Sequence, residues 1–211
     1  MASAKLHVLS KITASGLVAI VRTDDSEQAS RMVGACAEGG AVAIEITFTV
    51  PGAATVIGEL VKRYPAVQIA LGAGTVLDRA DVARVSGAGG RIIVSPDTNV
   101  DVISATASAG LVASPGYFTP SEALAAVRAG ATALKLFPAE AASPAVLKAQ
   151  LAVIPKQVPI MVVGGVKPDS MRPWLDAGAT GFGLGGGLYR PGQSPAETLD
   201  KARAYVEGLK S

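Results

Sequence analysis

Two ionisable residues interrupt the most apolar segments of the sequence: Lys135 in A-L-K-L-F and Glu45 in A-I-E-I-T. Side chains along a β-strand alternate between its two faces, so Leu134 and Leu136 share one face and Lys135 points to the other. Glu45 repeats this pattern between two isoleucines. The spacing therefore predicts an amine and a carboxyl group on the inner faces of two buried strands.

An amine and an acid in such a place could do covalent chemistry. Burial lowers the pKa of a lysine, and a neutral amine attacks a carbonyl carbon where an ammonium group does not. A carboxyl group nearby can give and take protons in turn. The alternative for Lys135 and Glu45 is a structural ion pair, which compensates part of the cost of burying two charges.

Short apolar runs recur about every 20 residues, which is the length of a strand and a returning helix. Their content of Val and Ile without strict alternation is typical of parallel strands that are buried on both faces. We expect eight strands, near residues 17–22, 41–47, 67–74, 91–96, 111–116, 132–138, 159–165 and 180–186.

Helices are expected between these strands. Ser26 and Thr119 are candidate N-caps, and Glu122 completes a capping box with Thr119. A further helix over residues 4–14 would close one end of a barrel. Eight strand–helix units predict that residues 1–211 form one (β/α)₈ TIM-type barrel domain, with both charges toward the end that carries active sites in this fold.

A doubly wound open sheet is the alternative fold. Gly181, Gly183 and Gly186 match the G-x-G-x-x-G spacing of dinucleotide-binding proteins. That motif must open a βαβ unit, and these glycines follow the last expected strand. The barrel is therefore favoured.

Glycine clusters follow the last two expected strands: Gly164 with Gly165, and Gly185 with Gly186 and Gly187. The loops at these two places bind phosphate in many TIM barrels, because glycine lets backbone N–H groups approach the oxygens. Tight turns explain single glycines equally well, but two clusters at the expected strands favour a phosphate site.

Other candidates stand at the ends of expected strands. Arg22 could bind a carboxylate through its guanidinium fork, and Thr75 could donate a hydrogen bond to the same group. Pro96 shapes the loop after residues 91–96. Lys167 and Arg190 follow the glycine clusters and could add positive charge there.

Composition excludes several classes of function. The net charge of +2 is spread without a basic run, which argues against a nucleic-acid partner. No apolar stretch is long enough to span a membrane, and the N-terminus lacks a signal-peptide core, so we expect a cytoplasmic protein. With one histidine, His7, and one cysteine, Cys36, neither a zinc site nor a disulfide is expected.

Taken together, these motifs resemble the 2-keto-3-deoxy-6-phosphogluconate / 2-keto-3-deoxy-6-phosphogalactonate aldolase family. The resemblance runs from about residue 17 to residue 195. It is carried by A-I-V-R, V-A-I-E-I-T, G-A-G-T-V-L, V-S-P-D-T, S-P-G-Y-F-T-P-S-E, A-L-K-L-F-P-A-E, V-V-G-G-V-K-P and G-L-G-G-G-L-Y-R-P-G-Q-S.

The resemblance implies a trimeric class I aldolase that needs no metal or cofactor. It makes Lys135 the Schiff-base lysine and Glu45 the acid/base. By the same resemblance, Arg22 and Thr75 bind the carboxylate of the substrate. The phosphate binds the glycines that match the family's phosphate loops, which are Gly164, Gly165, Gly185 and Gly186.

Within the family, Arg22 at the end of the first expected strand and the segment G-L-Y-R-P-G-Q-S resemble the galactonate branch. The segment F-P-A-E resembles the gluconate branch. Thr49 stands where the gluconate branch carries an arginine. Gly186 replaces a common phosphate-loop serine, and Val163 replaces a threonine.

The implied partners are a phosphorylated 2-keto-3-deoxy sugar acid and its product pyruvate. A phosphosugar isomerase or epimerase, or a phosphosugar-binding module without catalysis, would share the barrel and the phosphate loops. Neither would need an inward lysine as a nucleophile.

Overall fold

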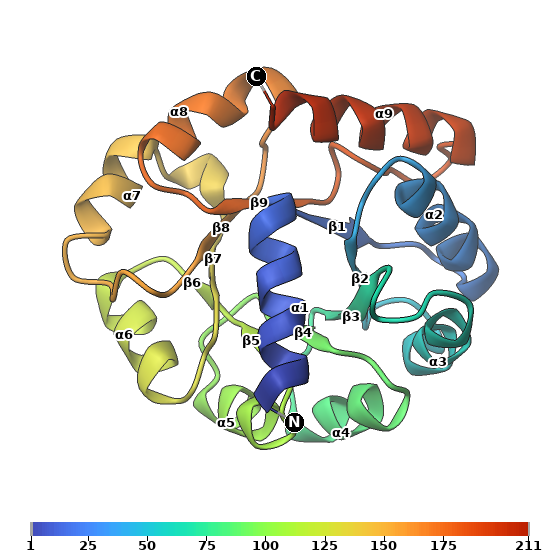
Figure 1. Cartoon of the computed structure of the whole chain (residues 1–211), viewed down its shortest axis with the longest axis horizontal. Coiled ribbons are helices and arrows are strands. Elements are labelled where there is room, and N and C mark those ends of the chain that lie inside the picture. The colour runs from blue at the N-terminus through green and yellow to red at the C-terminus, as the bar shows by residue number, and fades with distance from the viewer. Residues whose placement is uncertain (1, 211) are drawn as a thin grey trace.

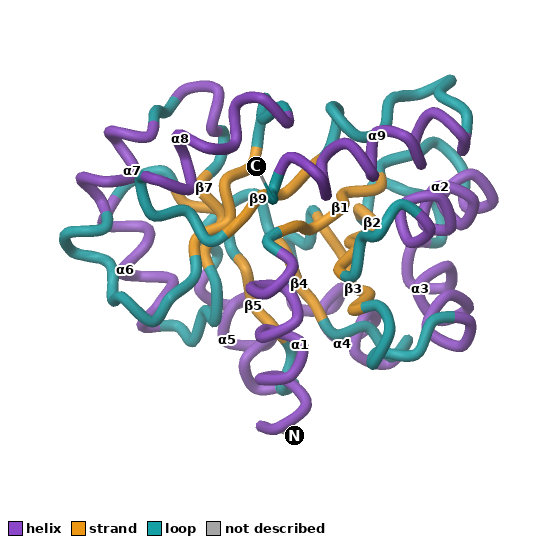
Figure 2. Tube along the Cα trace, turned by 45° about the horizontal axis from the view of Figure 1, so that its top comes forward, coloured by secondary structure: helices purple, strands orange, loops and turns teal. Residues whose placement is uncertain are grey.

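The computed structural model describes residues 2–210 and has helices arranged around a core of parallel strands (Figures 1 and 2). The strands are β1 (Leu17–Val21), β2 (Ala43–Thr47), β3 (Ala70–Gly74), β4 (Ile92–Val94), β5 (Val112–Ser114), β6 (Gly116–Tyr117), β7 (Leu134–Leu136), β8 (Ile160–Val163) and β9 (Gly181–Leu184). The α-helices are α1 (Ala2–Ser15), α2 (Ser26–Glu38), α3 (Ala53–Arg63), α4 (Arg79–Gly87), α5 (Val100–Ser108), α6 (Pro120–Arg128), α7 (Pro144–Gln150), α8 (Met171–Asp176) and α9 (Pro195–Gly208), with 3₁₀ turns η1 (Ala139–Ala141) and η2 (Pro168–Ser170).

The sheet closes on itself through the segment that contains β5 and β6. The strand order runs from β5 through β4, β3, β2, β1, β9, β8 and β7 to β6. Only Pro115 separates β5 from β6 in the chain, and proline has no N–H to donate to a ladder. The backbone N–H of Lys135 still donates to the carbonyl of Pro115 at 2.9 Å. This segment is thus one interrupted strand, and the expected (β/α)₈ TIM-type barrel is confirmed.

Two apolar layers form on the two faces of the strands. Leu134 and Leu136 belong to the layer between strands and helices, as do Ile44 and Ile46. A second, smaller cluster fills the barrel interior and includes Val18, Ile20, Ala43, Ala70, Ile92, Val94, Val112, Met161 and Val163. The alternation predicted for Lys135 and Glu45 is therefore confirmed, and both side chains enter the interior.

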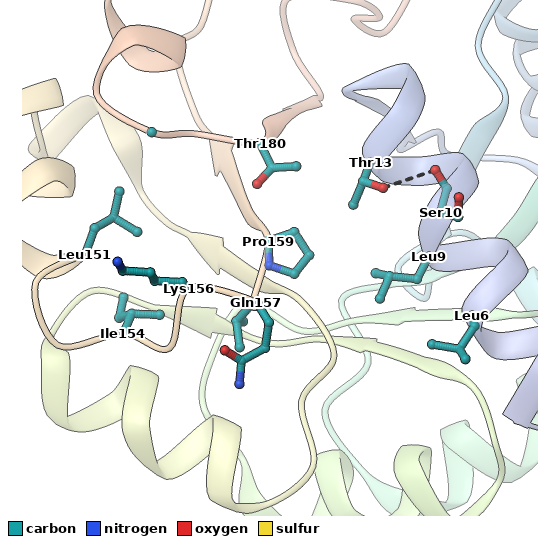
Figure 3. A pocket seen from close by; sticks show the side chains of 12 residues that line it. Leu6, Leu9, Ser10, Thr13, Leu151, Ile154, Lys156, Gln157, Pro159 and Thr180 are labelled. Atoms are coloured by element: carbon teal, nitrogen blue, oxygen red, sulfur yellow. Dashed lines mark hydrogen bonds between the residues drawn. The ribbon is translucent and has the colours of Figure 1, made fainter.

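Helix α1 covers the end of the barrel where the strands begin, as was expected for residues 4–14 (Figure 1). Val8 and Ile12 of this helix pack into the interior cluster. Beside α1 lies a groove of about 770 Å³, between the helix and the segments that lead into β8 and β9 (Figure 3). Lys156 is its one charged lining residue, so this larger hollow lacks an acid–base pair.

Capping side chains begin most of the helices soon after a strand ends. Thr119 and Glu122 form the predicted capping box at the start of α6. The prediction for α2 was wrong by one residue: the side chain of Asp25, not Ser26, accepts from the backbone N–H of Gln28 at 2.7 Å. A carboxylate at this position also interacts favourably with the helix dipole. None of the helices formed by residues 2–210 is long and apolar enough to cross a bilayer.

Candidate functional site

A cavity of about 380 Å³ opens at the end of the barrel where the strands terminate. Each residue to which the sequence assigned a catalytic or substrate-binding role lines it, and the loops after β1, β3, β4, β7, β8 and β9 contribute to the wall. These residues are Arg22, Glu45, Thr75, Pro96, Lys135, Gly164, Gly165, Gly185 and Gly186. The structure thus brings them together; their individual roles stay predictions.

Lys135 and Glu45 are buried in this cavity, with 7% and 2% of their surface exposed. No ion pair or hydrogen bond joins the two side chains. The Lys135 ammonium nitrogen instead lies 4.5 Å from the centre of the Phe137 ring, on the same face of the chain. The structural ion pair considered for these residues is therefore not formed, and both groups can reach a molecule in the cavity.

The surroundings shift the pKa of both groups toward their uncharged forms. Burial raises the pKa of Glu45 from 4.5 to about 6, although the positive charges of Lys135 and Arg22 oppose the shift. Burial also lowers the pKa of Lys135, with Glu45 opposing and Arg22 adding to that effect. An amine with a lowered pKa next to an acid with a raised pKa suits nucleophilic attack followed by proton transfer.

Neighbouring residues leave the Glu45 carboxyl group a close-fitting and mostly apolar space. A Cβ atom at Gly74 would overlap the carboxylate of Glu45, so the glycine at this position of β3 leaves the space that the acid fills. Beneath the two charges is a gap of about 20 Å³ with an almost wholly apolar lining. This apolar floor explains why desolvation is the largest influence on both pKa values.

Arg22 is held at the cavity wall by hydroxyl groups. Its Nη1 donates to Thr49 Oγ1 and its Nη2 to Thr75 Oγ1, both at 2.9 Å. Thr75 has φ of 57°, in the left-handed region that non-glycine residues rarely adopt. The guanidinium has further N–H donors beyond these two, so it can still bind a carboxylate.

The glycine pair after β8 adopts positive φ angles, 120° at Gly164 and 64° at Gly165. The side chain of Glu140 packs against both, and a Cβ at Gly165 would lie 2.7 Å from Glu140 Cγ. After β9, the Nε of Arg190 donates to the carbonyl of Gly186 at 2.9 Å. Positive charge therefore lies on the β9 side of the glycine loops and negative charge on the β8 side.

Sequence reasoning assigned no role to three of the larger side chains in the cavity wall: Phe137, Glu140 and Tyr205. The first two stand in the same L-F-P-A-E text as Lys135, which could have indicated them. Tyr205 comes from α9, and its hydroxyl donates to the carbonyl of Val166 at 2.9 Å. Nothing in its local sequence signals that contact. Arg190 lines the cavity, whereas Lys167 is not among the lining residues.

The fold and the site define a (β/α)₈ barrel that offers a buried amine and a protonatable acid to a small molecule. The family model described as "KDPG and KHG aldolase" matches residues 8–201. The chain belongs to this family, as the sequence motifs indicated.

Two relatives and one solved structure are similar to this chain over most of its length. A "Probable 2-dehydro-3-deoxy-6-phosphogalactonate aldolase" of Rhizobium meliloti (strain 1021) is 43% identical over 90% of this chain and 89% of its own. The "2-dehydro-3-deoxy-6-phosphogalactonate aldolase" of Escherichia coli (strain K12) is 38% identical over 92% and 94%. A structure titled "Native KDPGal structure" superposes with a TM-score of 0.88 at 38% identity, covering 92% of this chain and 94% of that one.

Proposed function

We propose that this protein is a class I aldolase that reversibly cleaves a 2-dehydro-3-deoxy-6-phospho sugar acid to pyruvate and glyceraldehyde 3-phosphate. The observation that carries the proposal is the pair Lys135 and Glu45, buried in one cavity and not bonded to each other. Both groups are therefore available to a substrate that enters between the strand ends.

Lys135 is the nucleophile in this mechanism. Its neutral amine adds to the C2 ketone of the substrate, and the resulting carbinolamine loses water to give a cationic iminium. Glu45 gives the proton that leaves with this water. The carboxylate of Glu45 then takes the C4 hydroxyl proton, the C3–C4 bond breaks, and its electron pair moves into the iminium to form an enamine.

The reaction ends with the return of a proton. Glyceraldehyde 3-phosphate leaves, and Glu45 protonates C3 of the enamine. Water then hydrolyses the iminium, which releases pyruvate and restores the Lys135 amine. The iminium withdraws the electrons that a metal ion would otherwise attract, so the mechanism uses no metal or cofactor.

The two ends of the substrate have separate binding groups in this proposal. Arg22 and Thr75 hold the carboxylate, while Pro96 shapes the wall beside C1 and C2. The backbone N–H groups of Gly164, Gly165, Gly185 and Gly186 hold the phosphate. Gly186 offers no hydroxyl, and Arg190, anchored on the Gly186 carbonyl, supplies positive charge on that side.

We expect the galactonate-series substrate to be preferred over its gluconate-series C4 epimer. The two relatives named for phosphogalactonate are 43% and 38% identical, whereas the phosphogluconate aldolase of Pseudomonas aeruginosa is 31% identical. Cleavage rates on the two epimers, measured side by side, test this preference. A higher kcat/KM on the gluconate epimer would reverse it.

Borohydride reduction in the presence of pyruvate tests the function itself. An aldolase of this class gains a stable adduct on Lys135, found by peptide mass spectrometry, and loses its cleavage activity. An isomerase or epimerase, or a binding module, would stay unmodified. Full activity and no adduct after this treatment would refute the proposed function.

The family resemblance also suggests a homotrimer in the cytoplasm. Sedimentation of the purified protein tests the assembly: a mass near three chains of 21.1 kDa supports it, and a single-chain mass contradicts it. Fractionation of the source cells tests the location.

A further inference from the structure

A row of hydroxyl groups ties Arg22 to the neighbouring strands. Thr49 Oγ1 accepts from Arg22 Nη1 at 2.9 Å and lies 2.8 Å from Thr47 Oγ1. On the other side, Thr75 Oγ1 accepts from Nη2. The guanidinium of Arg22, the residue after β1, is therefore held between a residue that follows β2 and a residue that follows β3.

Thr47, the last residue of β2, contacts Thr49 from the buried side. Its side chain is fully buried, and within residues 2–210 Thr49 is its one hydrogen-bond partner. The Thr49 hydroxyl therefore contacts Thr47 on one side and the Arg22 guanidinium on the other, and either threonine can be the donor in the bond between them. Because Thr47 is two residues from Glu45 on the same strand face, this contact links Arg22 to the strand that carries the acid.

Both anchors of Arg22 are uncharged. In the described part of the chain no carboxylate pairs with this arginine, unlike Arg31, Arg84 and Arg172, which pair with acids on their own helices. An acidic anchor would fix the guanidinium equally well but would neutralise it. Hydroxyl anchors fix its orientation and leave its charge for an anion.

We propose that Thr49 is a positioning residue, which holds the Arg22 guanidinium in the orientation that receives the carboxylate of the keto acid. This inference rests on the proposed function, because it takes pyruvate and the sugar acid as the ligands. Thr49 is not one of the residues lining the cavity, so it acts through Arg22.

The position of Arg22 also affects the reacting pair. Its charge lowers the pKa of Glu45 and the pKa of Lys135. A displaced guanidinium would let both pKa values rise. The other titratable or charged groups that line the cavity are Glu140 of η1, Arg190 after β9 and Tyr205 of α9, and substitution of Thr49 leaves them in place.

The test compares Thr49→Val, which keeps the shape and removes the hydroxyl, with Thr49→Ser, which keeps the hydroxyl. Thr55→Val is the control, since Thr55 is an exposed residue of α3 away from the cavity. We expect Thr49→Val to raise the pyruvate concentration for half-maximal borohydride trapping about tenfold, the effect of losing one well-placed hydrogen bond to a charged group. Thr49→Ser and Thr55→Val should trap pyruvate like the unmodified protein.

Two further measurements separate positioning from a general structural effect. The pH profile of kcat/KM should move to higher pH in Thr49→Val and stay in place in Thr49→Ser. In an Arg22→Ala background, the Thr49→Val change should have almost no further effect on trapping, because the group that Thr49 positions is absent. An undiminished tenfold effect in that background would overturn the inference.

A crystal structure of Thr49→Val decides the matter independently of catalysis. We expect the Arg22 guanidinium to leave the Thr75 hydroxyl; an unchanged guanidinium would overturn the inference even if Lys135 traps pyruvate. If the unmodified protein traps no pyruvate, the proposed function fails, and this structure still tests whether Thr49 fixes Arg22.

Discussion

Replacement of Glu45 by Gln should stabilise the fold while it slows the reaction. Glu45 is 2% exposed and has no hydrogen bond or ion pair within the described residues. Burial raises its pKa from 4.5 to about 6. This difference corresponds to about 2 kcal/mol of folding free energy, lost when the carboxyl group ionises inside the protein.

The sign of the pH dependence follows from the raised pKa. Below about pH 4.5 the acid is protonated in both the folded and the unfolded chain, so the unmodified protein and the Glu45→Gln variant should have similar stabilities. As the pH rises from about 4.5 to about 6, the unfolded chain releases this proton while the folded protein still holds it, so the folded state loses stability, and the loss is complete once the pH is well above 6. The advantage of Glu45→Gln should therefore grow from near zero at about pH 4 to about 2 kcal/mol at about pH 8, or roughly 4–8 °C in Tm.

Urea unfolding of both proteins at several pH values measures this difference. Subtracting the two curves cancels the contribution of the shared groups whose pKa does not depend on Glu45. Glu38→Gln is the matched control, because Glu38 is exposed on α2, and its difference should stay near zero throughout. If the stability difference between Glu45→Gln and the unmodified protein is independent of pH, or favours Glu45 at high pH, the assignment of a buried acid with a raised pKa is refuted.

The remaining predictions concern the same cavity. The kcat/KM of the unmodified enzyme should fall as the pH drops through about 6, because a Glu45 that is already protonated cannot take the proton that Lys135 must lose before it attacks; an acid limb near 4.5 would contradict this. Glu45→Gln should slow turnover about 10²–10⁴-fold, and near-normal rates would leave Glu45 a structural role. Lys135→Met should abolish cleavage and pyruvate trapping yet keep a folded barrel by circular dichroism, since it removes a buried charge; turnover above background would contradict it. Thr75→Gly should be about 1 kcal/mol more stable than Thr75→Ala, because residue 75 has φ of 57°; the opposite order in urea unfolding would show that this loop relaxes.

The sequence was sufficient to predict which face Lys135 and Glu45 occupy. Each has apolar neighbours on both sides in the chain, and a barrel strand has one face toward the helices and one toward the interior. The ends of parallel strands meet on one rim, so Arg22 and the glycine pairs could also be placed at that rim. These predictions needed only local pattern and the fold.

Contacts between separate loops could not be predicted in this way. Arg22 and Thr49 are 27 residues apart, and their hydrogen bond depends on the turn that follows β2. Glu140 reaches the glycines after β8 because η1 turns the chain across the rim. Each such contact depends on the path of a loop and on the rotamer of one side chain. The face on which a strand side chain lies depends only on the two-residue period of the strand.

The charges of the cavity suggest how substrate binding would favour the iminium. In the free protein, the positive charge of Arg22 lowers the pKa of Lys135 and so favours the neutral, nucleophilic amine. In the proposed mechanism, a substrate carboxylate binds Arg22 and offsets this charge. The cation that then forms at the Lys135 nitrogen meets less repulsion than the ammonium of the free protein does. Arg22 thus favours attack by the neutral amine before the carboxylate binds, and it repels the iminium less once the carboxylate is bound. This double effect requires a charged Arg22, and therefore neutral hydroxyl partners such as Thr49 in place of an acid.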